Sequence, residues 1–516
     1  METMLIRLHA SHCKIDSLET IEFPNLRHLD LSWNLLETVD MQSLQLLHNL
    51  QVLVLAHNPL TTIASSVSDY DCHRLQTLDL SYTRLEEFGK DDLGTCFTLK
   101  TLNISYAPVT GLGPDALENV DNLEVLDLTG SPVLEYEDNV FKHLKSLRLL
   151  YTENYRLCCS VMLPDDFEMR QGRCYSKADL VASCDDLLKS NVYRVFLCVM
   201  AVLSLLGNFA SFGWRIYFNR SKMGSFGIFV TNLTIADFCM GVYLVIIFAA
   251  DLSYRGIYVS RDLQWKRSAY CSLAGFLSFL SNEVSVINTC LITIDRILVL
   301  RFPFSQFRFK FGSACVACAF SWLAGGILAL IPLLPSFSYW NFYSQTGICI
   351  PLPLVQKHGF PGYMYSFSVT IIFNFLLFVG IAVGQVFIYL TIQAQAMKAM
   401  WKDSKSKDAT IATRLVSVAL SDFCCWFPIG LLGILSFTNV YINSELNIAV
   451  AIFALPFNSA LNPFLYTFNV LLEMRNKKKE ASLLRRLELQ LKLEQRGKTT
   501  SSATQWEIKD CSNSAE

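Results

Sequence analysis

Seven stretches of this 516-residue sequence are apolar over a length that can cross a lipid bilayer. An α-helix needs about 20 mainly apolar residues to span the hydrocarbon core. The stretches cover residues 192–218, 226–250, 271–300, 313–335, 363–392, 410–437 and 446–470. Because 52% of all residues are hydrophobic and only 17% are charged, the chain is too apolar for ordinary soluble domains. The sequence therefore predicts a multi-pass membrane protein with an all-α bundle of seven transmembrane helices over residues 192–470.

Basic residues in the loops predict the orientation of this bundle. One set of loops has nine basic residues and the alternate set has five, and basic loops usually lie on the cytoplasmic side. The nine are Arg220, Lys222, Arg301, Arg308, Lys310, Lys398, Lys402, Lys405 and Lys407. Since the number of spans is odd, we expect an extracellular N-terminus and a cytoplasmic C-terminus in the plasma membrane.

Residues 1–157 repeat the pattern L-x-x-L-x-L-x-x-N, which is typical of leucine-rich repeats. Five clear copies start 24, 25, 24 and 24 residues apart, at Leu26, Leu50, Leu75, Leu99 and Leu123. A weaker copy starts at Leu147, and the end of an earlier one starts at Leu5. Each copy contributes a strand to a solenoid, with its first, fourth and sixth positions in the core. The predicted fold is therefore multi-domain: an α/β horseshoe solenoid of leucine-rich repeats, followed by the helical bundle.

The first residues, METMLIRLHASHCKID, already belong to a repeat. They have neither the basic n-region nor the apolar h-region of a signal peptide. We therefore expect either a sequence that is truncated at its N-terminus or a first span that acts as a signal anchor.

The ninth position of each repeat should carry a side chain that bonds to backbone groups at the turn. Asn34 and Asn58 fit, whereas three later repeats carry Thr83, Ala107 and Ser131. We expect this polar ladder to weaken toward the membrane and the later repeats to be less regular. Cys72 and Cys96 occupy a repeat position that is leucine or valine elsewhere, so we interpret them as buried free thiols rather than as a disulfide.

The third, fifth and seventh positions of each repeat point out of the concave face, because side chains alternate along a strand. With strands about 4.8 Å apart, this face is about 25–30 Å long, which suits a small protein ligand better than a metabolite. The candidate ligand-binding residues are Asp30, Asp79, Asn103, Asp127 and Glu153. The acidic residues could pair with basic ligand residues, although Asp-Leu-Ser is also common filler in such repeats. Asn103 begins an N-I-S glycosylation sequence, and a glycan there would obstruct binding.

Residues 158–191 follow the repeats and contain four cysteines within 27 residues. They are Cys158, Cys159, Cys174 and Cys184. We interpret this segment as an extracellular hinge held by disulfides, since disulfides persist in oxidising surroundings. Four cysteines allow three pairings, and the sequence does not choose among them.

Several polar side chains lie inside the predicted spans. An aspartate at the centre of a bilayer costs roughly 2.5–3.5 kcal/mol, so such residues are expected to be buried and functional. They are Asn208, Asp237, Ser285, Asn458 and Asn462. Pro463 frees a backbone carbonyl in the last span, and Asn462 and Tyr466 can satisfy such groups inside a bundle.

A set of short motifs occurs in order and at consistent spacing along the bundle. They are Gly207-Asn208, Leu233 with Asp237, Cys271, Asp295-Arg296, Trp322, Cys425-Trp426-Phe427-Pro428 and Asn462-Pro463-x-x-Tyr466. Together they resemble the signature of rhodopsin-like G-protein-coupled receptors. The resemblance implies a hydrated pocket that can hold a structural sodium ion, formed by Asp237, Ser285, Asn458 and Asn462. We expect no other cofactor.

The same resemblance implies roles at the two ends of the bundle. The activation switch would be formed by Trp426, Asp422 and Tyr466. The G-protein-coupling end would be formed by Asp295, Arg296 and Asp408. Asp408 could pair with Arg296 in the inactive state, or it could simply be solvated at the membrane boundary. Cys271 would form a disulfide with Cys349.

Repeats joined to such a bundle narrow the resemblance to the leucine-rich-repeat receptors, and residue details favour their relaxin-receptor-like branch, invertebrate-type relatives included. The stretches that carry it are ADFCMGVYL, DLSYRGIY, NEVSV, DFCCWFPI and LPFNSALNPFLYTF. Ile297 stands where the family usually has tyrosine, which should alter coupling strength. Only Cys13 precedes Cys72, so we expect no cysteine-rich low-density-lipoprotein-type module in this sequence. Because such a module contributes to activation in the resembled receptors, a protein that binds its ligand without signalling stays an alternative.

Several other classes do not fit. The seventh span has no lysine for a retinal Schiff base, and Ser278 stands where amine receptors of the resembled family carry aspartate. We expect neither light sensing nor a small cationic amine ligand. The matched halves of many transporters are not recognisable. A phosphate loop, an H-E-x-x-H motif and a nucleophile elbow are also missing, so we expect neither an enzyme nor a metal-binding or nucleic-acid-binding protein.

The tail, residues 471–516, begins with a basic run that we interpret as an amphipathic helix on the membrane surface. Its serines and threonines could recruit arrestin when phosphorylated, or could belong to a disordered tail. The predicted function is a receptor whose repeats bind a relaxin/insulin-like peptide or protein hormone and whose bundle signals to a heterotrimeric G protein. The alternative is an adhesion or decoy protein that uses the bundle only as an anchor.

Overall fold

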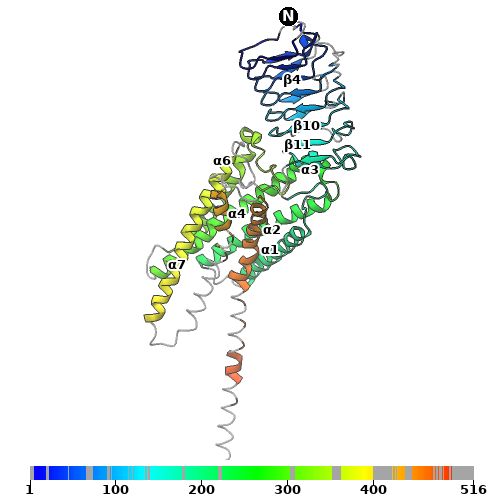
Figure 1. Ribbon diagram of the computed structural model, residues 1–516. Helices are drawn as coiled ribbons and strands as arrows, with labels where there is room; N and C mark the ends of the chain where they lie inside the picture. The colour runs from blue at the N-terminus through cyan, green and yellow to red at the C-terminus, as the bar shows by residue number, and fades with distance from the viewer. Residues whose placement is uncertain are drawn as a thin grey trace, which may run out of the picture. The chain divides into compact units, whose positions relative to one another are not determined.

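The computed structural model divides the chain into two compact units (Figure 1). The first unit comprises Met1–Lys189 and Tyr254–Leu263, and the second comprises Ser190–Ser253 and Gln264–Glu516. The structure describes residues 5–18, 22–44, 46–64, 72, 74–89, 93, 96–113, 116–118, 120–133, 136, 140–176, 181–218, 224–302, 308–350, 362–398, 421, 423, 425, 427–435, 444–468, 471, 475, 479, 481–486 and 490.

Eight short strands form one parallel sheet along the first unit (Figure 1). In spatial order they are β1 (Arg7–His9), β2 (His28–Asp30), β4 (Val52–Val54), β6 (Thr77–Asp79), β8 (Thr101–Asn103), β10 (Val125–Leu128), β11 (Leu149–Thr152) and β12 (Arg173–Tyr175). Each of the first seven begins at the third position of a leucine motif, so the predicted solenoid of repeats is confirmed. Pairing stays in register through β10, β11 and β12. The expectation of less regular later repeats is therefore wrong for the backbone.

The leucine positions of the motif form the core of the solenoid. Leu26, Leu29 and Leu31 are at most 2% exposed, and the equivalent side chains of later repeats join them in one continuous apolar cluster. A 3-10 turn, η2 (Met41–Leu44), and two small sheets complete the repeats. The small sheets pair β3 (Thr38–Asp40) with β5 (Thr62–Ala64), and β7 (Glu87–Phe88) with β9 (Gly111–Leu112).

The polar ladder at the ninth position weakens along the chain, as predicted. Asn34 accepts hydrogen bonds from the backbone N–H groups of Cys13 and Ile15, and donates to the Ala10 and Leu31 carbonyls. Thr83 only donates to the Leu80 carbonyl at 2.8 Å. Shorter side chains reach fewer backbone groups, so fewer turns are tied together in the later repeats.

A disulfide joins Cys72 to Cys96, so the prediction of two free thiols is wrong. The two residues hold the same position in neighbouring repeats, and stacking of the repeats brings their Cα atoms to 4.8 Å. That separation lies within the range that a disulfide bridges.

Two further disulfides close the hinge by joining Cys158 to Cys174 and Cys159 to Cys184. They select one of the three pairings that the sequence left open. A 3-10 turn, η3 (Tyr155–Cys158), precedes them. The sequence did not predict that hinge residues 173–175 would extend the repeat sheet as β12.

The segment Tyr254–Leu263, which lies between two transmembrane helices in the sequence, is part of the first unit. It includes the start of α3 (Tyr258–Lys266), where Asp262 is fully buried and forms an ion pair with Arg156 at 3.0 Å. The Val259 side chain packs against Cys159 and Met162. This loop is therefore built into the end of the repeat domain.

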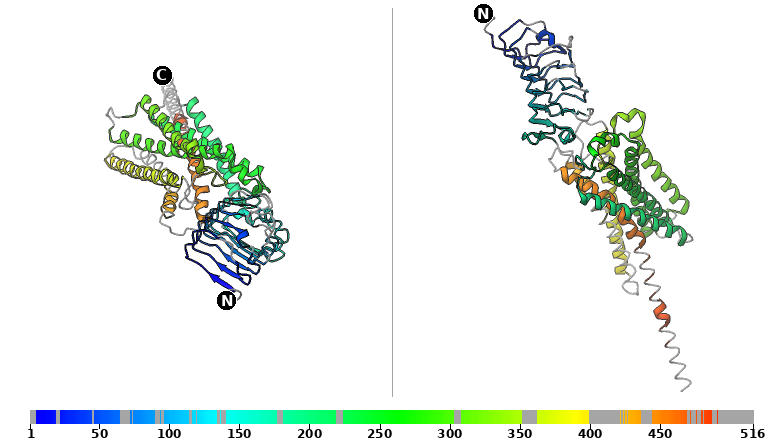
Figure 2. Two further views of the ribbon diagram at one scale, coloured as in Figure 1. Left: turned by 90° about the horizontal axis from the view of Figure 1, so that it is seen from above. Right: turned by 90° about the vertical axis from the view of Figure 1, so that its right-hand side faces the viewer.

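The second unit is a bundle of helices that run side by side (Figures 1 and 2). Its elements are α1 (Asn191–Phe218), α2 (Ser225–Ser253), α4 (Ala269–Arg301), α5 (Phe311–Leu330), η5 (Ile331–Leu333), η6 (Pro335–Trp340), α6 (Tyr363–Ser366), η7 (Phe367–Phe373), α7 (Asn374–Lys398), α9 (Ser444–Pro463) and η8 (Phe464–Phe468). The elements η7 and η8 are π-helical, so the helices that contain them are widened there.

Among the described residues, four helices are long and apolar enough to cross a membrane. They are Asn191–Tyr217, Ser225–Ser253, Phe311–Leu333 and Tyr363–Ala394. The helices α4 and α9 coincide with the third and seventh predicted spans. Residues 427–435 are helical within the sixth, most of which lies outside the described residues.

Candidate functional site

A buried polar cluster joins four helices of the bundle around Asp237. The Asp237 carboxylate on α2 is fully buried and accepts hydrogen bonds from Ser285 Oγ on α4 at 2.6 Å and from Asn462 Nδ2 on α9 at 2.7 Å. Ser204 of α1 donates to the Asp237 backbone carbonyl. Asn458 is also buried, and its Oδ1 has no partner among the described residues. Three residues of the predicted sodium pocket are therefore in direct contact, and the fourth, Asn458, is buried one turn before Asn462 on α9.

Pro463 explains why α1 and α9 meet beside this cluster. Proline has no backbone N–H, so the carbonyl four residues earlier, that of Ser459, loses its intrahelical donor. Asn208 Nδ2 of α1 donates to that carbonyl at 3.1 Å. A Cβ atom on Gly207 would lie 3.1 Å from Pro463 Cγ, so the glycine permits the close approach. Gly207 and Asn208 together allow Pro463 to lie inside a membrane helix without an unsatisfied carbonyl.

Arg296 lies near the end of α4, beside Asp295. The Asp295 carboxylate is buried, accepts a hydrogen bond from Ser225 Oγ at 2.7 Å and lies 3.7 Å from the Arg296 guanidinium. The guanidinium also lies over the Phe226 ring, 3.7 Å from its centroid. Thus Asp295 and Arg296 are both held against α2. The predicted partner Asp408 lies outside the described residues.

The predicted activation switch is only partly described. Tyr466 is buried in η8, directly after the Pro463 turn, and packs with Phe229 and Ile292. Trp426 and Asp422 lie outside the described residues. Cys271 at the start of α4 forms a disulfide with Cys349, as the resemblance implied.

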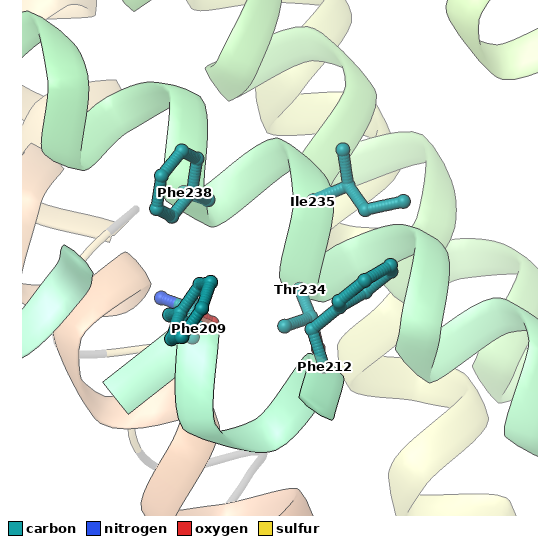
Figure 3. Close-up of a pocket in the computed structure, with 6 residues that line it drawn as sticks. Phe209, Phe212, Thr234, Ile235 and Phe238 are labelled. Carbon is teal, nitrogen blue, oxygen red and sulfur yellow. The ribbon is translucent and has the colours of Figure 1, made fainter. Parts of the chain in front are cut away.

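A cavity of about 250 Å³ opens between α1 and α2 (Figure 3). Its lining residues are Asn208, Phe209, Phe212, Thr234, Ile235 and Phe238. Phe209 is 67% exposed and Ile235 is 39% exposed, so the cavity faces outward from the two helices. In a membrane it would face lipid, and it is not a site for a water-soluble ligand.

The predicted acidic row lies at the ends of the repeat strands. Asp30, Asp79 and Asp127 each accept a hydrogen bond from the backbone N–H two residues later, at 2.8–3.0 Å. Asn103 accepts the same bond from Ser105. One oxygen of each side chain therefore shapes the turn, which is the structural role that repeat filler would have. Glu153 lies just beyond β11 rather than within it.

Sequence reasoning missed a column of stacked rings at the eighth position of five successive repeats. It is formed by His12, Trp33, His57, Tyr82 and Tyr106, with successive ring centroids 5.2, 3.8, 4.2 and 4.6 Å apart. About half of each Trp33, Tyr82 and Tyr106 side chain is exposed. The signal was present in the sequence, because all five residues occupy one position of the repeat.

The backbone beneath this aromatic column is left-handed, with φ of 57° at each of the five residues. The left-handed conformation costs about 1–2 kcal/mol for a residue with a Cβ atom, whereas a stacked pair contributes about 0.5–1.5 kcal/mol. The next repeat has Gly130 at this position, with φ of 76°. The stacking free energy of four ring pairs therefore does not clearly exceed the backbone cost of five left-handed residues. Stability alone does not explain why these five repeats carry a ring where the next repeat has Gly130.

Comparison with known proteins agrees with both units. Residues 213–466 match the family model of the 7 transmembrane receptor (rhodopsin family), and residues 24–85 match the model of the leucine rich repeat. The chain therefore belongs to the leucine-rich-repeat receptors of the rhodopsin family, which are multi-pass membrane proteins and not a class of enzyme.

Within this family the chain is similar to G-protein coupled receptor GRL101 of Lymnaea stagnalis and to human relaxin receptors. It is 38% identical to GRL101 over 349 residues, which cover 67% of this chain and 30% of that receptor. It is 32% identical to human relaxin receptor 2 over 319 residues, 62% of this chain and 41% of the receptor. It is 31% identical to human relaxin receptor 1 over 295 residues, which cover 57% of this chain and 39% of the receptor. The matched region thus spans less than half the length of each relative.

Proposed function

We propose that this protein is a plasma-membrane receptor that binds a relaxin/insulin-like peptide or protein hormone through its repeats and signals to a heterotrimeric G protein. The observation that carries the proposal is the buried cluster around Asp237, which draws polar groups from α1, α2, α4 and α9 into the bundle. Buried polar groups inside a membrane are costly and usually functional. An adhesion or decoy protein that uses the bundle only as an anchor would not need them.

The orientation follows from chemistry on both sides of the membrane. Among the described residues, one disulfide lies in the repeats and two lie in the hinge. The fourth joins Cys271, at the start of α4, to Cys349. Disulfides persist in oxidising surroundings, which supports an extracellular N-terminal unit. The basic loops and tail are then cytoplasmic.

The concave face supports a basic peptide as the ligand. Asp79 and Asp127 each use one carboxylate oxygen for the turn, which leaves the second available for a basic group, whereas the second oxygen of Asp30 contacts His9. In the turns that follow the strands, the aromatic column supplies exposed rings of the kind that are enriched at protein interfaces. A ligand on this face would contact Asp79, Asn103 and Asp127 unless a glycan on Asn103 excludes it.

In the bundle, the Asp237 cluster would bias the equilibrium between inactive and G-protein-competent states. The residues fit a sodium ion, because the Asp237 carboxylate and the Ser285 hydroxyl supply oxygen ligands, and Asn458 Oδ1 is a further oxygen without a hydrogen-bond partner in the described part of the chain. Trp426, Asp422 and Tyr466 would form the switch, and Arg296 would meet the G protein. Phosphorylation of the tail would add arrestin as a partner.

Charge reversal on the concave face tests the ligand site. We expect Asp79→Lys combined with Asp127→Lys to weaken binding of a labelled relaxin/insulin-like peptide by at least about tenfold, or about 1.4 kcal/mol. Asp40→Lys is the matched control, because Asp40 lies on β3 outside the eight-stranded sheet. Equal affinity of all variants would place the site elsewhere. Binding without any G-protein response would favour the decoy alternative.

A further inference from the structure

Glu283 of α4 is a fully buried acid that the proposed mechanism does not use. Its Oε1 accepts a hydrogen bond from Asn374 Nδ2 at 2.9 Å, and Asn374 is itself 2% exposed. The second oxygen of each side chain, Glu283 Oε2 and Asn374 Oδ1, is buried and has no hydrogen-bond partner among the described residues. Buried polar atoms in folded proteins are rarely left without a hydrogen-bond partner, so these two oxygen atoms require an explanation.

An ionised Glu283 would need a balancing positive charge beside it. No described basic side chain forms an ion pair with it. The titratable groups that face it are Tyr343, which precedes α6, and Tyr365 of α6. Their hydroxyls already donate to the carbonyls of Ala329 and Leu328. The Asp237 carboxylate of α2, a helix that packs against α4, takes its hydrogen bonds from Ser285 and Asn462.

The helices pack closely around Glu283. A Cβ atom on Gly325 of α5 would lie 2.8 Å from Val284 Cγ2 and 3.6 Å from Glu283 Cβ, so the α5 backbone presses directly on this turn of α4. Asn374 begins α7 immediately after the π-helical η7. A π-turn rotates the residues that follow it relative to a regular helix, and such turns are frequent at functional positions.

A single proton would provide a hydrogen-bond partner for both oxygen atoms. If Glu283 Oε2 carries a proton, it becomes a donor, and Asn374 Oδ1 is an acceptor on the residue that already donates to Oε1. The two groups then form a cyclic acid–amide pair with two hydrogen bonds. An ionised Glu283 would instead leave two unpaired acceptors and an uncompensated charge inside the bundle.

We propose that Glu283 is a neutral carboxylic acid that forms a proton-dependent latch with Asn374 between α4 and α7. Transfer of its proton to water would break one of the two hydrogen bonds and place a charge between the helices. The latch would then open. The proposal concerns the bundle alone and does not rest on the identity of the hormone.

Infrared spectroscopy of the purified full chain tests the protonation state. We expect a carboxylic-acid C=O band at neutral pH that is lost in Glu283→Gln and shifted in frequency in Asn374→Leu. Asp237→Asn, which removes another fully buried acid of the bundle, should leave the Glu283 band in place. A wild-type spectrum in which Glu283→Gln removes only carboxylate bands would overturn the proposal.

Thermal unfolding gives a second and independent readout. Glutamine retains a donor and an acceptor for Asn374, so Glu283→Gln should unfold near the wild-type temperature. Glu283→Ala and Asn374→Leu should each lower that temperature, and the double variant should lower it no further than either alone. If Glu283→Gln does not fold, or is as unstable as Glu283→Ala, the pairing proposed for the neutral acid is wrong. The Asn374→Leu band shift checks that result without any change at Glu283.

Discussion

At the scale of single residues, the bundle depends on side chains that satisfy particular backbone groups. Asn208 is the clearest case, since its Nδ2 donates to the Ser459 carbonyl that Pro463 leaves without an intrahelical donor. Arg215 has a related role further along α1, because its guanidinium donates to the Tyr466 carbonyl in η8 at 3.0 Å. The two contacts tie α1 to the seventh predicted span on either side of Pro463, one in α9 and one in η8.

Replacement of Asn208 should therefore destabilise the bundle. Asn208→Leu keeps the volume but leaves a buried carbonyl unpaired, and we expect a loss of about 1–3 kcal/mol. Thermal unfolding of the purified protein measures it. Ser253→Ala is the matched control, because Ser253 is exposed and donates within its own helix to Ala249. The interpretation fails if Asn208→Leu is no less stable than this control.

Asp30 makes the first repeats sensitive to acid. Burial raises its pKa, but hydrogen bonds from Ser32 and His9 outweigh burial, so the pKa lies below the usual value. A group with a lowered folded pKa stabilises the fold above its unfolded pKa, about 3.9, and that stability is lost as pH falls through the folded pKa. Residues 26–34 should therefore lose protection against amide hydrogen exchange, taken relative to the intrinsic exchange rate at each pH, below about pH 4.

Substitution at this position provides the check. Asp30→Asn should show a smaller acid-induced loss of protection against hydrogen exchange over residues 26–34 than the wild type. Asp127→Asn is the control, since Asp127 accepts the same backbone bond and has no histidine partner among the described residues. If Asp30→Asn keeps the full acid response, another group causes it.

At the scale of elements, the aromatic column separates stability from binding. Trp33→Gly removes both the stack and the left-handed backbone cost, so the fold should be retained. If the column contacts the ligand, affinity for a labelled relaxin/insulin-like peptide should fall by about tenfold, or about 1.4 kcal/mol. Unchanged affinity in a folded Trp33→Gly protein would leave the column with a structural role only.

The segment Tyr254–Leu263 is held in the first unit by the buried Arg156–Asp262 ion pair. Arg156→Met removes the cation of a buried ion pair, while Tyr258 still donates to the Asp262 carboxylate, and loss of one partner of such a pair costs about 3–5 kcal/mol. Surface expression and thermal unfolding should both fall. Replacement of both partners, Arg156→Met with Asp262→Leu, should recover most of the loss. A single variant as stable as the double one would mean that the ion pair contributes little.

The elements also show how far sequence reasoning reaches. The leucine period predicts the repeat strands and their register, because a solenoid repeats one contact at every turn. The period also aligned Cys72 with Cys96 and the members of the aromatic column, but the two cysteines were interpreted as free thiols and the eighth position received no prediction. In contrast, Arg156 with Asp262, and Glu283 with Asn374, are far apart in the sequence and follow no period. Only the folded chain brings such pairs together.

At the scale of the whole molecule, the sequence joins a ligand-sized repeat surface to a bundle with a buried polar cluster. The motifs of the bundle predicted Asp237, Ser285 and Asn462 as one site because a family resemblance carries spatial information that composition lacks. Trp426, Asp422 and Asp408 lie outside the described residues, so their roles stay predictions. The proposed receptor mechanism requires both parts of the chain to act together.

The most direct test is peptide-stimulated nucleotide exchange on a panel of heterotrimeric G proteins, with the full chain expressed behind an added signal peptide. We expect stimulation by a relaxin/insulin-like peptide that is lost when residues 1–157 are deleted and falls about tenfold, or about 1.4 kcal/mol, in Arg296→Ala. Equal surface levels are the control. Peptide binding without exchange on any G protein, or exchange unaffected by Arg296→Ala, would contradict the receptor mechanism.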